Sequence, residues 1–312
     1  LPYWLRLVIA LVVIVAPTLA LSILVAQDGY RNTEELAASQ AQHDAMLVDL
    51  YLRTYLDKYF GILKTLAVER ARSKAAGSNA TDNPRALLER VALDHPRVGA
   101  LVAIDDAGKI IASSRPEALG LNLSGDTWWN QLANSHIPVV SDFEDLPPLG
   151  GPIVILAVPV PDGGEAVALS LNTSTMSTVW EGLSSAGTIL LVDRQGIPIV
   201  QSNRRYLSSA ERNELAADTA VLPVVRQSTG VATFRNVPNF AGARSAIGAG
   251  LVDPDYGWSV IAIQDRETVL GPVLQGMLRT WIMLAASVFA SFVIAVILIG
   301  HGSMRRVVLP EI

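Results

Sequence analysis

Cysteine is absent from this chain of 312 residues, and histidine occurs only four times. Without cysteine the chain can form no disulfide bond, and it offers neither a thiolate ligand for a metal ion nor a cysteine nucleophile. No two of the histidines stand at the spacing of a metal-binding motif; they are His43, His95, His136 and His301. We therefore expect neither a metal site nor a cofactor.

Catalytic motifs are absent as well. The sequence contains no G-x-S-x-G nucleophile elbow, no phosphate-binding Walker loop and no H-E-x-x-H pair. Two adjacent carboxylates, Asp105 and Asp106, precede Ala-Gly, a pattern far more typical of a hairpin turn than of acid–base catalysis. We predict that this chain is not an enzyme, and a hydrolase would need catalytic residues that it lacks. The prediction does not extend to an output domain elsewhere in a longer protein.

Positive charge is scarce. Lys and Arg number 24 against 29 Asp and Glu, which gives a formal net charge of −5. No run of basic residues is interleaved with aromatic ones, which is the usual signature of a nucleic-acid-binding surface. The sequence therefore predicts no nucleic-acid partner.

Long hydrophobic runs are present near both ends of the chain. Residues 5–26 carry one charge, Arg6, and residues 281–300 carry none. Each run is long enough for a helix that crosses the roughly 30 Å of hydrocarbon in a bilayer. A signal peptide is the alternative for the first run, but its apolar part would be shorter and a small-residue cleavage site would follow. We predict two transmembrane helices.

Basic residues set the expected orientation of these helices. Arg6 precedes the first run, and Arg305 and Arg306 follow the second. Because basic residues favour the cytoplasmic side, we expect both ends to be cytoplasmic and residues 27–278 to face outward. The sequence begins with Leu and stops soon after the second run, so we expect a fragment of a longer protein.

A long helix is predicted to leave the membrane over residues 28–76. Apolar residues recur there at the spacing of one helical face; they are Leu52, Tyr55, Leu56, Tyr59, Ile62, Leu63 and Leu66. This face is expected to pack along the helix's own domain. The first half is also expected to form the seam of a homodimer, although Gln40, Gln42 and His43 interrupt its heptad pattern.

Two similar segments follow, about 90 residues apart. Residues 99–114 read GALVAIDDAGKIIASS and residues 187–202 read GTILLVDRQGIPIVQS. Each predicts a β-hairpin with Asp and Gly at its turn. Further strands are expected at VVSDF, IVILAVPV, EAVALSL, ATF, ARSAIGAG and WSVIAI, with short helices near residues 174–183 and 208–217. The sequence therefore predicts an α+β fold with two antiparallel-sheet modules.

The order of these segments resembles that of the double Cache (dCache) sensors, the extracytoplasmic domains of bacterial transmembrane receptors. The resemblance covers roughly residues 28–268 and rests on four stretches: ALVAIDDAGKIIASS, LGLNLSGDTWWNQLANSHIPVVSDF, IVILAVPVPDGGEAVALSLNTS and GWSVIAIQDRETVLGPV. It implies two PAS-like modules after the long helix. The membrane-distal module, over residues 77–183, is expected to hold the ligand pocket, and the membrane-proximal module spans residues 184–268.

The resemblance implies that the loop and short helix after the first hairpin form one wall of the pocket. Trp128 and Trp129 stand where the family has an aromatic pair. An indole offers a large apolar face and one N–H donor, which suits ligand binding. The alternative is that one Trp fills the core beneath the sheet and the other lies on the surface.

Several positions depart from the pattern of the family's amino-acid-binding members. Asp126 replaces the Arg that would hold a ligand carboxylate. Asp142 is retained, but Val140 replaces the Tyr two residues before it. Where a further Asp is expected to help hold the amine, Ser170 or Asn172 is nearest. The carboxylate clamp is therefore missing.

These departures predict the class of ligand. Asp126 and Asp142 near two indoles suit an amine or another cation better than a standard amino acid, through charge pairing and cation–π contact. A sugar, another neutral ligand, or no small ligand at all remains open. The alternative role for both Asp side chains is the commoner one, in which they cap the helix and the strand end. His136 is a further candidate for the pocket, although such a residue is more often exposed or capping.

The last residues are expected to begin the cytoplasmic signalling part of the protein. Residues 269–300 are predicted to lead into and form the second transmembrane helix, and residues 301–312, HGSMRRVVLPEI, resemble the entry to a HAMP linker. In the family such a linker leads to a chemoreceptor, histidine-kinase or diguanylate-cyclase output. The alternative function is a membrane-tethered interaction or structural module, which predicts an exposed aromatic patch and no enclosed cavity.

Overall fold

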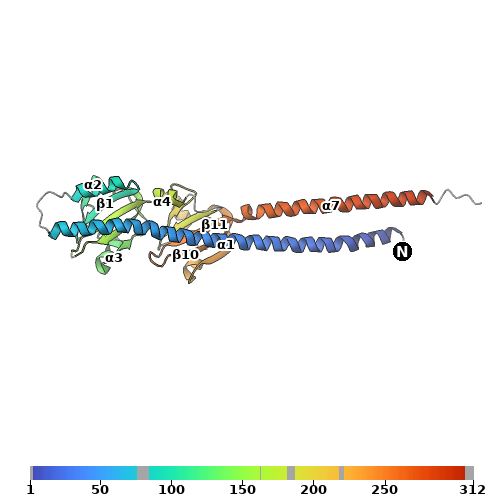
Figure 1. The fold of residues 1–312 in the computed structure, drawn as a ribbon, viewed down its shortest axis with the longest axis horizontal. Helices are drawn as coiled ribbons and strands as arrows, with labels where there is room; N and C mark the ends of the chain where they lie inside the picture. The colour runs from blue at the N-terminus through green and yellow to red at the C-terminus, as the bar shows by residue number, and fades with distance from the viewer. Residues whose placement is uncertain (1–2, 76–83, 162, 181–186, 218–220, 306–312) are drawn as a thin grey trace, which may run out of the picture. The chain divides into compact units, whose positions relative to one another are not determined.

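The computed structural model describes residues 3–75, 84–161, 163–180, 187–217 and 221–305 (Figure 1). It separates into two compact units. We call residues 37–265 the central unit, and residues 1–36 with 266–312 the terminal unit. Each unit is described by itself.

The terminal unit contains part of the longest helix and the whole of the second longest. They are α1 (Tyr3–Ala75), whose remainder belongs to the central unit, and α7 (Arg266–Arg305). Arg266 donates to Glu34 Oε1 over 2.7 Å and lies above the Tyr30 ring, 5.4 Å from its centroid. These contacts fix the first residue of α7 against α1.

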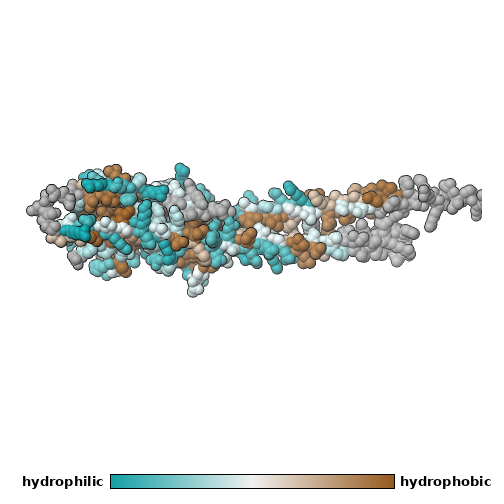
Figure 2. Space-filling view, in the orientation of Figure 1, coloured by the Kyte–Doolittle hydropathy of each residue, from teal (hydrophilic) through white to brown (hydrophobic). Residues whose placement is uncertain are grey.

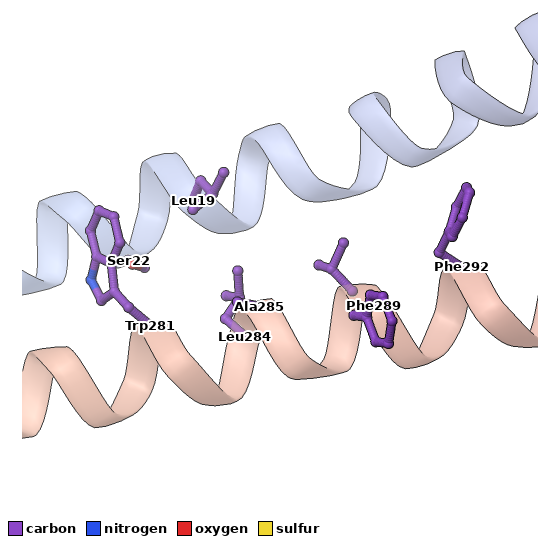
Figure 3. Close-up of a pocket in the computed structure, with 8 residues that line it drawn as sticks. Leu19, Ser22, Trp281, Leu284, Ala285, Phe289 and Phe292 are labelled. Carbon is purple, nitrogen blue, oxygen red and sulfur yellow. The ribbon is translucent and has the colours of Figure 1, made fainter.

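Apolar side chains cover much of α7 (brown in Figure 2). Among the described residues one helix is long and apolar enough to cross a membrane, Arg266–Ile294. An apolar groove of about 510 Å³ lies between α1 and α7, with Trp281 beside Ser22 at one end and Phe292 at the other (Figure 3). The first predicted span, residues 5–26, forms part of α1, but the side chains of residues 3–15 lie outside those described, so this span stays a prediction.

The first module of the central unit is built on an antiparallel sheet of order β2-β1-β6-β5-β3, with β4 paired to β5. Its strands are β1 (Val98–Ile104), β2 (Ile110–Ser113), β3 (Val139–Val140), β4 (Glu144–Leu146), β5 (Gly151–Pro159) and β6 (Ala166–Asn172). Its helices are α2 (Pro84–Asp94) and α3 (Thr127–Ser135), with short 3₁₀ turns at Pro116–Ala118 and Pro147–Leu149.

The second module repeats this plan with the order β8-β7-β11-β10-β9. Its strands are β7 (Thr188–Val192), β8 (Pro198–Gln201), β9 (Ala232–Phe240), β10 (Ala243–Val252) and β11 (Ser259–Asp265), and its helices are α5 (Ser209–Ala217) and α6 (Leu222–Gln227). The helix α4 (Thr173–Trp180) follows β6 directly and contacts strands of both sheets. In both sheets the first hairpin pairs with the last strand of the module. The predicted α+β fold and both hairpins are confirmed.

Two strand predictions were wrong in detail. The run VVSDF was expected as one strand, but only Val139–Val140 pairs as β3 and the chain pairs again as β4. At this break the Ser141 hydroxyl accepts a hydrogen bond from the N–H of Ile155 over 2.9 Å. In a regular sheet a backbone carbonyl would accept that N–H. The strand expected at ATF continues to Phe240 as β9, and α6 was not predicted.

One face of α1 is buried against both sheets (Figure 1). The cluster contains Val48, Leu52, Leu56, Tyr59, Leu63 and Leu66 from the helix, Leu101, Val154, Leu156 and Leu169 from the first sheet, and Ile189, Leu191, Trp258 and Val260 from the second. The predicted apolar face of the helix is therefore its core face, with Ile62 only partly buried. Because both modules pack on this helix, they share this cluster, and each module also has a cluster of its own.

We predict that Leu56→Ala lowers the free energy of unfolding of the central unit by about 2–5 kcal/mol, because the wholly buried side chain leaves a cavity in the shared core. Chemical denaturation of the full chain measures the change. Leu93→Ala, at an 82% exposed position of α2, is the matched control and should change it by less than about 0.5 kcal/mol. Equal effects of the two variants would contradict the shared core.

Candidate ligand site of the first module

The helix α3 begins directly after a turn. Asp126 is its N-cap residue, with extended backbone angles, but the Asp126 side chain makes no capping hydrogen bond. Instead the amide of Asn130 donates to the carbonyl of Asp126 over 3.1 Å. The carboxylate of Asp126 therefore does not cap the helix, and the capping alternative is wrong for this residue.

Both indoles carried by α3 are buried, Trp128 at 2% exposure and Trp129 at 4%. Their rings meet edge to face, with centroids 6.2 Å apart. Trp129 lies under the β1–β2 turn, where a Cβ atom on Gly108 would approach its Nε1 to 2.9 Å. The alternative that one Trp lies on the surface is wrong, and these two residues form no exposed aromatic patch.

The indole of Trp128 has an unused donor. Its Nε1 is buried and has no hydrogen-bond partner in the described part of the chain. Burial raises the pKa of Asp126, and the Trp128 N–H partly offsets that rise, so the indole N–H lies toward this carboxyl although no hydrogen bond joins the two. A buried donor without a partner is costly, and such groups often mark a binding site.

Glu144 on β4 completes an acidic group. Burial raises its pKa to about 7, and the negative charges of Asp126, Asp142 and Asp193 add to the rise. Among the described residues neither Asp126 nor Glu144 has a basic side chain as an ion-pair partner. We call Asp126, Glu144 and Trp128 the acidic site.

Asp142 is engaged elsewhere. Its Oδ1 accepts the Arg194 side chain over 2.8 Å, and the guanidinium of Arg194 also donates to the carbonyl of Val140 over 2.7 Å. Arg194 belongs to the turn between β7 and β8, so this ion pair joins the two modules. Asp142 contributes negative charge to the acidic site, but its own carboxylate already has a partner.

The next residue, Phe143, is also held by the second module. Its N–H donates to Asp193 Oδ2 over 3.2 Å, and the guanidinium of Arg212 lies 4.0 Å from the centroid of its ring. Arg212 is 3% exposed, and burial lowers its pKa to about 10. The segment between β3 and β4 is therefore held by the second module, and Glu144 follows it directly on β4.

The remaining predicted residues have local partners. The hydroxyl of Ser170 accepts the N–H of Ala100 over 2.8 Å and donates to the carbonyl of Leu149 over 2.6 Å. His136 is exposed and ends α3 in a left-handed conformation with φ of 53°. Ser170 thus fastens the sheet and His136 terminates the helix, and we propose neither as a ligand contact.

Glu144 was missed by sequence reasoning. It lies two residues after Asp142, so both would face the same side of one continuous strand. In the structure Asp142 pairs with Arg194, whereas Glu144 has no basic ion-pair partner among the described residues, and the charges of Asp126, Asp142 and Asp193 all raise its pKa. The only signal in the sequence was the second acidic residue at this spacing.

Comparison with known proteins identifies the family. A family model described as a Cache domain, dCache, matches residues 29–273. The chain resembles the sensor domain of the Vibrio cholerae histidine kinase DctB, at 16% identity and a TM-score of 0.50, over 76% of this chain and 98% of that one. No curated protein matches the sequence.

Two chemoreceptor domains share the fold more closely. The ligand-binding domain of Pseudomonas aeruginosa PctB, solved with L-Arg, has 14% identity and a TM-score of 0.54 over 76% of this chain and 97% of its own. That of Pseudomonas fluorescens CtaA, solved with L-isoleucine, has 16% identity and a TM-score of 0.55 over 77% of this chain and 95% of its own. At these identities the likeness is one of fold. Because the family model covers most of the sequence, this chain belongs to the double Cache (dCache) family of sensor domains.

Proposed function

We propose that this chain is the extracytoplasmic sensing and transmembrane signalling region of a bacterial receptor, and that its first module binds an amine or another small cation at the acidic site. The observation that carries the proposal is a pair of half-buried carboxyl groups that interact through their charges, Asp126 and Glu144, with the unused indole N–H of Trp128 near Asp126.

The electrostatics of this site favour a cation. Burial is the largest cause of the raised pKa of Glu144, and repulsion by the nearby carboxylates, Asp126 first among them, adds to it. A cationic ligand would offset the repulsion by pairing with both groups, and an indole face could add a cation–π contact. An anion would be repelled, and a standard amino acid would find no Arg for its carboxylate at Asp126.

The competing functions have less support. A neutral ligand such as a sugar would leave the negative charge unbalanced. A protein-interaction module was expected to expose its aromatic pair, yet Trp128 and Trp129 are both buried. We therefore place the interaction module second.

Signalling is proposed to follow from a population shift. The receptor would cross the inner membrane twice, with residues 27–278 outside and a HAMP-like linker starting at residues 301–312. A ligand shifts the balance between two states only by its different affinity for each. The acidic site includes Glu144 on β4, and the two residues before it, Asp142 and Phe143, contact the second module. Ligand binding at the acidic site would therefore act on the second module through these contacts. The output could be a chemoreceptor, a sensor kinase or a diguanylate cyclase.

A homodimer through residues 28–60 is part of the proposal. One face of α1 exposes apolar side chains at helical spacing: Met46, Leu47, Leu50 and Tyr51 are all at least 40% exposed. A second copy of the helix would cover such a face.

Replacing Leu47 and Leu50 together by Lys should therefore weaken self-association of the full chain by at least about tenfold in Kd, because two charges would be brought to an apolar seam. Analytical ultracentrifugation in detergent measures the mass. Leu93→Lys, on α2, is the control and should leave it unchanged. A native chain that sediments as a monomer, or a double variant that remains dimeric, would rule out this seam.

The ligand class is tested by thermal shift of the full chain in nanodiscs. Mono-, di- and polyamines are compared with amino acids, dicarboxylates and sugars. At about 100 times its Kd an amine should stabilise by ~2.7 kcal/mol, which raises Tm by at least ~2–4 °C. Glu144→Gln and Asp126→Asn should abolish that rise.

Asp145→Asn, at the exposed neighbour of Glu144 on β4, is the matched control and should keep the rise. A shift caused by dicarboxylates but not by amines would refute the cation assignment. No shift with any class would favour the interaction module.

Binding should also depend on pH. Because the pKa of Glu144 is raised to about 7, its carboxylate is lost as pH falls through 7, while an alkylamine stays protonated. We expect the Kd of the amine to be about tenfold weaker at pH 6 than at pH 8 by isothermal titration calorimetry. Asp145→Asn should keep this dependence. A constant Kd, or tighter binding at pH 6, would show that the Glu144 carboxylate does not hold the ligand.

A further inference from the structure

Within the central unit two charged clamps join α1 to the sheets, one in each module, at the β5–β6 turn and at the β10–β11 turn. In the first module Glu165 accepts Arg70 over 2.9 Å and Lys74 over 3.0 Å. In the second module Arg53 pairs with Asp253 over 3.0 Å and with Asp255 over 2.9 Å. The two clamps occupy equivalent places in the repeated plan.

The clamps have opposite charge balance. In the first, two basic groups surround one carboxylate. In the second, one guanidinium is surrounded by several carboxylates, because Asp49 also lies 3.2 Å from Arg53, one turn earlier on α1. Only the second clamp therefore holds more acid than its base can neutralise.

Asp253 is wholly buried and organises the β10–β11 turn. Its Oδ1 accepts the backbone N–H groups of Asp255 and Tyr256, each over 2.8 Å, and its Oδ2 faces Arg53. Asp49 offers Oδ2 to the same guanidinium, while its Oδ1 is buried and has no hydrogen-bond partner among the described residues. The buried carboxyl group of Asp253 and the partly buried one of Asp49 thus compete for one cation.

The surrounding charges do not resolve this competition. From α1 the cluster is faced by Asp49, Arg53 and Asp57, and from the turn by Asp253, Asp255 and Tyr256, whose hydroxyl donates to Asp57 over 3.5 Å. Burial raises the pKa of Asp49 to about 6, the nearby Asp253 carboxyl adds to the rise, and Arg53 opposes it. Protonation of one of the two carboxyl groups would remove the repulsion between Asp49 and Asp253.

We propose that Asp49 and Asp253 form a proton-operated latch, in which one proton taken up from the medium bridges the two carboxyl groups and fastens α1 to the β10–β11 turn. When Asp49 is protonated, its O–H donates to Asp253, and Arg53 keeps Asp253 and Asp255 as partners. When both groups are ionised they repel, and the turn loosens from the helix. The latch needs no ligand at the acidic site.

The direction of the pH effect follows from the raised pKa. A carboxyl whose folded-state pKa lies above its unfolded value adds stability below the unfolded pKa and loses it as pH rises through the folded one. The latch should therefore close as pH falls from above 7 toward 5. The first clamp behaves differently: burial opposes the change, but hydrogen bonds and charges from Lys74 and Arg70 lower the pKa of Glu165, so it stays ionised in this range.

Hydrogen–deuterium exchange of the full chain in nanodiscs tests the latch. After correction for the intrinsic pH dependence of exchange, the amides of Asp255 and Tyr256 should exchange about tenfold more slowly at pH 5 than at pH 7.5. Asp49→Asn, whose amide can donate like the protonated acid, should exchange slowly at both pH values. Asp49→Ala should show no pH dependence either, because only one carboxylate faces Arg53.

Asp255→Asn is the matched control, since it removes an exposed carboxylate from Arg53 and leaves the buried pair intact. It should keep the pH dependence. The turn around Glu165 should not change between the two pH values. The latch is overturned if the native β10–β11 turn shows no change, if Asp49→Asn keeps the native change, or if both turns change equally.

Discussion

Burial of one face of α1 against two sheets is the constraint on which the rest of the central unit depends. Neither sheet is large, and each leaves an apolar face that a partner must cover. The helix covers both at once, so that Leu56 and Leu63 belong to the same cluster as Leu156 of the first module and Leu191 of the second. Charged clamps at Arg53 and Arg70 then fix the helix at one turn of each module. A change in either module must be accommodated by packing on this helix.

The acidic site lies where the regular ladder of the first sheet is interrupted. Ser141 takes over a ladder hydrogen bond with its side chain, which frees the following residues for other contacts. Asp142 and Phe143 bind the second module, and Glu144 faces the acidic site. Three consecutive residues thus connect the proposed ligand site with the neighbouring module. The same interruption explains why the acidic group is only partly neutralised, since Arg194 reaches Asp142 but no basic side chain among the described residues reaches Glu144.

Local patterns in the sequence were sufficient to predict the architecture. The apolar spacing from Leu52 to Leu66 gave the buried face of the helix, and the two Asp-Gly hairpins revealed the repeat. The site was harder because it depends on long-range contacts. Asp142 is similarly placed in the family pattern, yet its partner Arg194 lies 52 residues away and gives no local signal. Ser170 was expected near the ligand, but the backbone of two neighbouring segments uses its hydroxyl. The Asp49–Asp253 pair joins residues from opposite ends of the central unit, which no periodicity connects.

The central claim is that the shared helix makes the two modules one cooperative structure. Differential scanning calorimetry of the full chain in nanodiscs tests it most directly. The account predicts that residues 37–265 unfold in a single transition whose calorimetric enthalpy equals its van't Hoff enthalpy. Two separate transitions, one for each module, would contradict it, because the packing of both sheets on α1 would then not couple their unfolding.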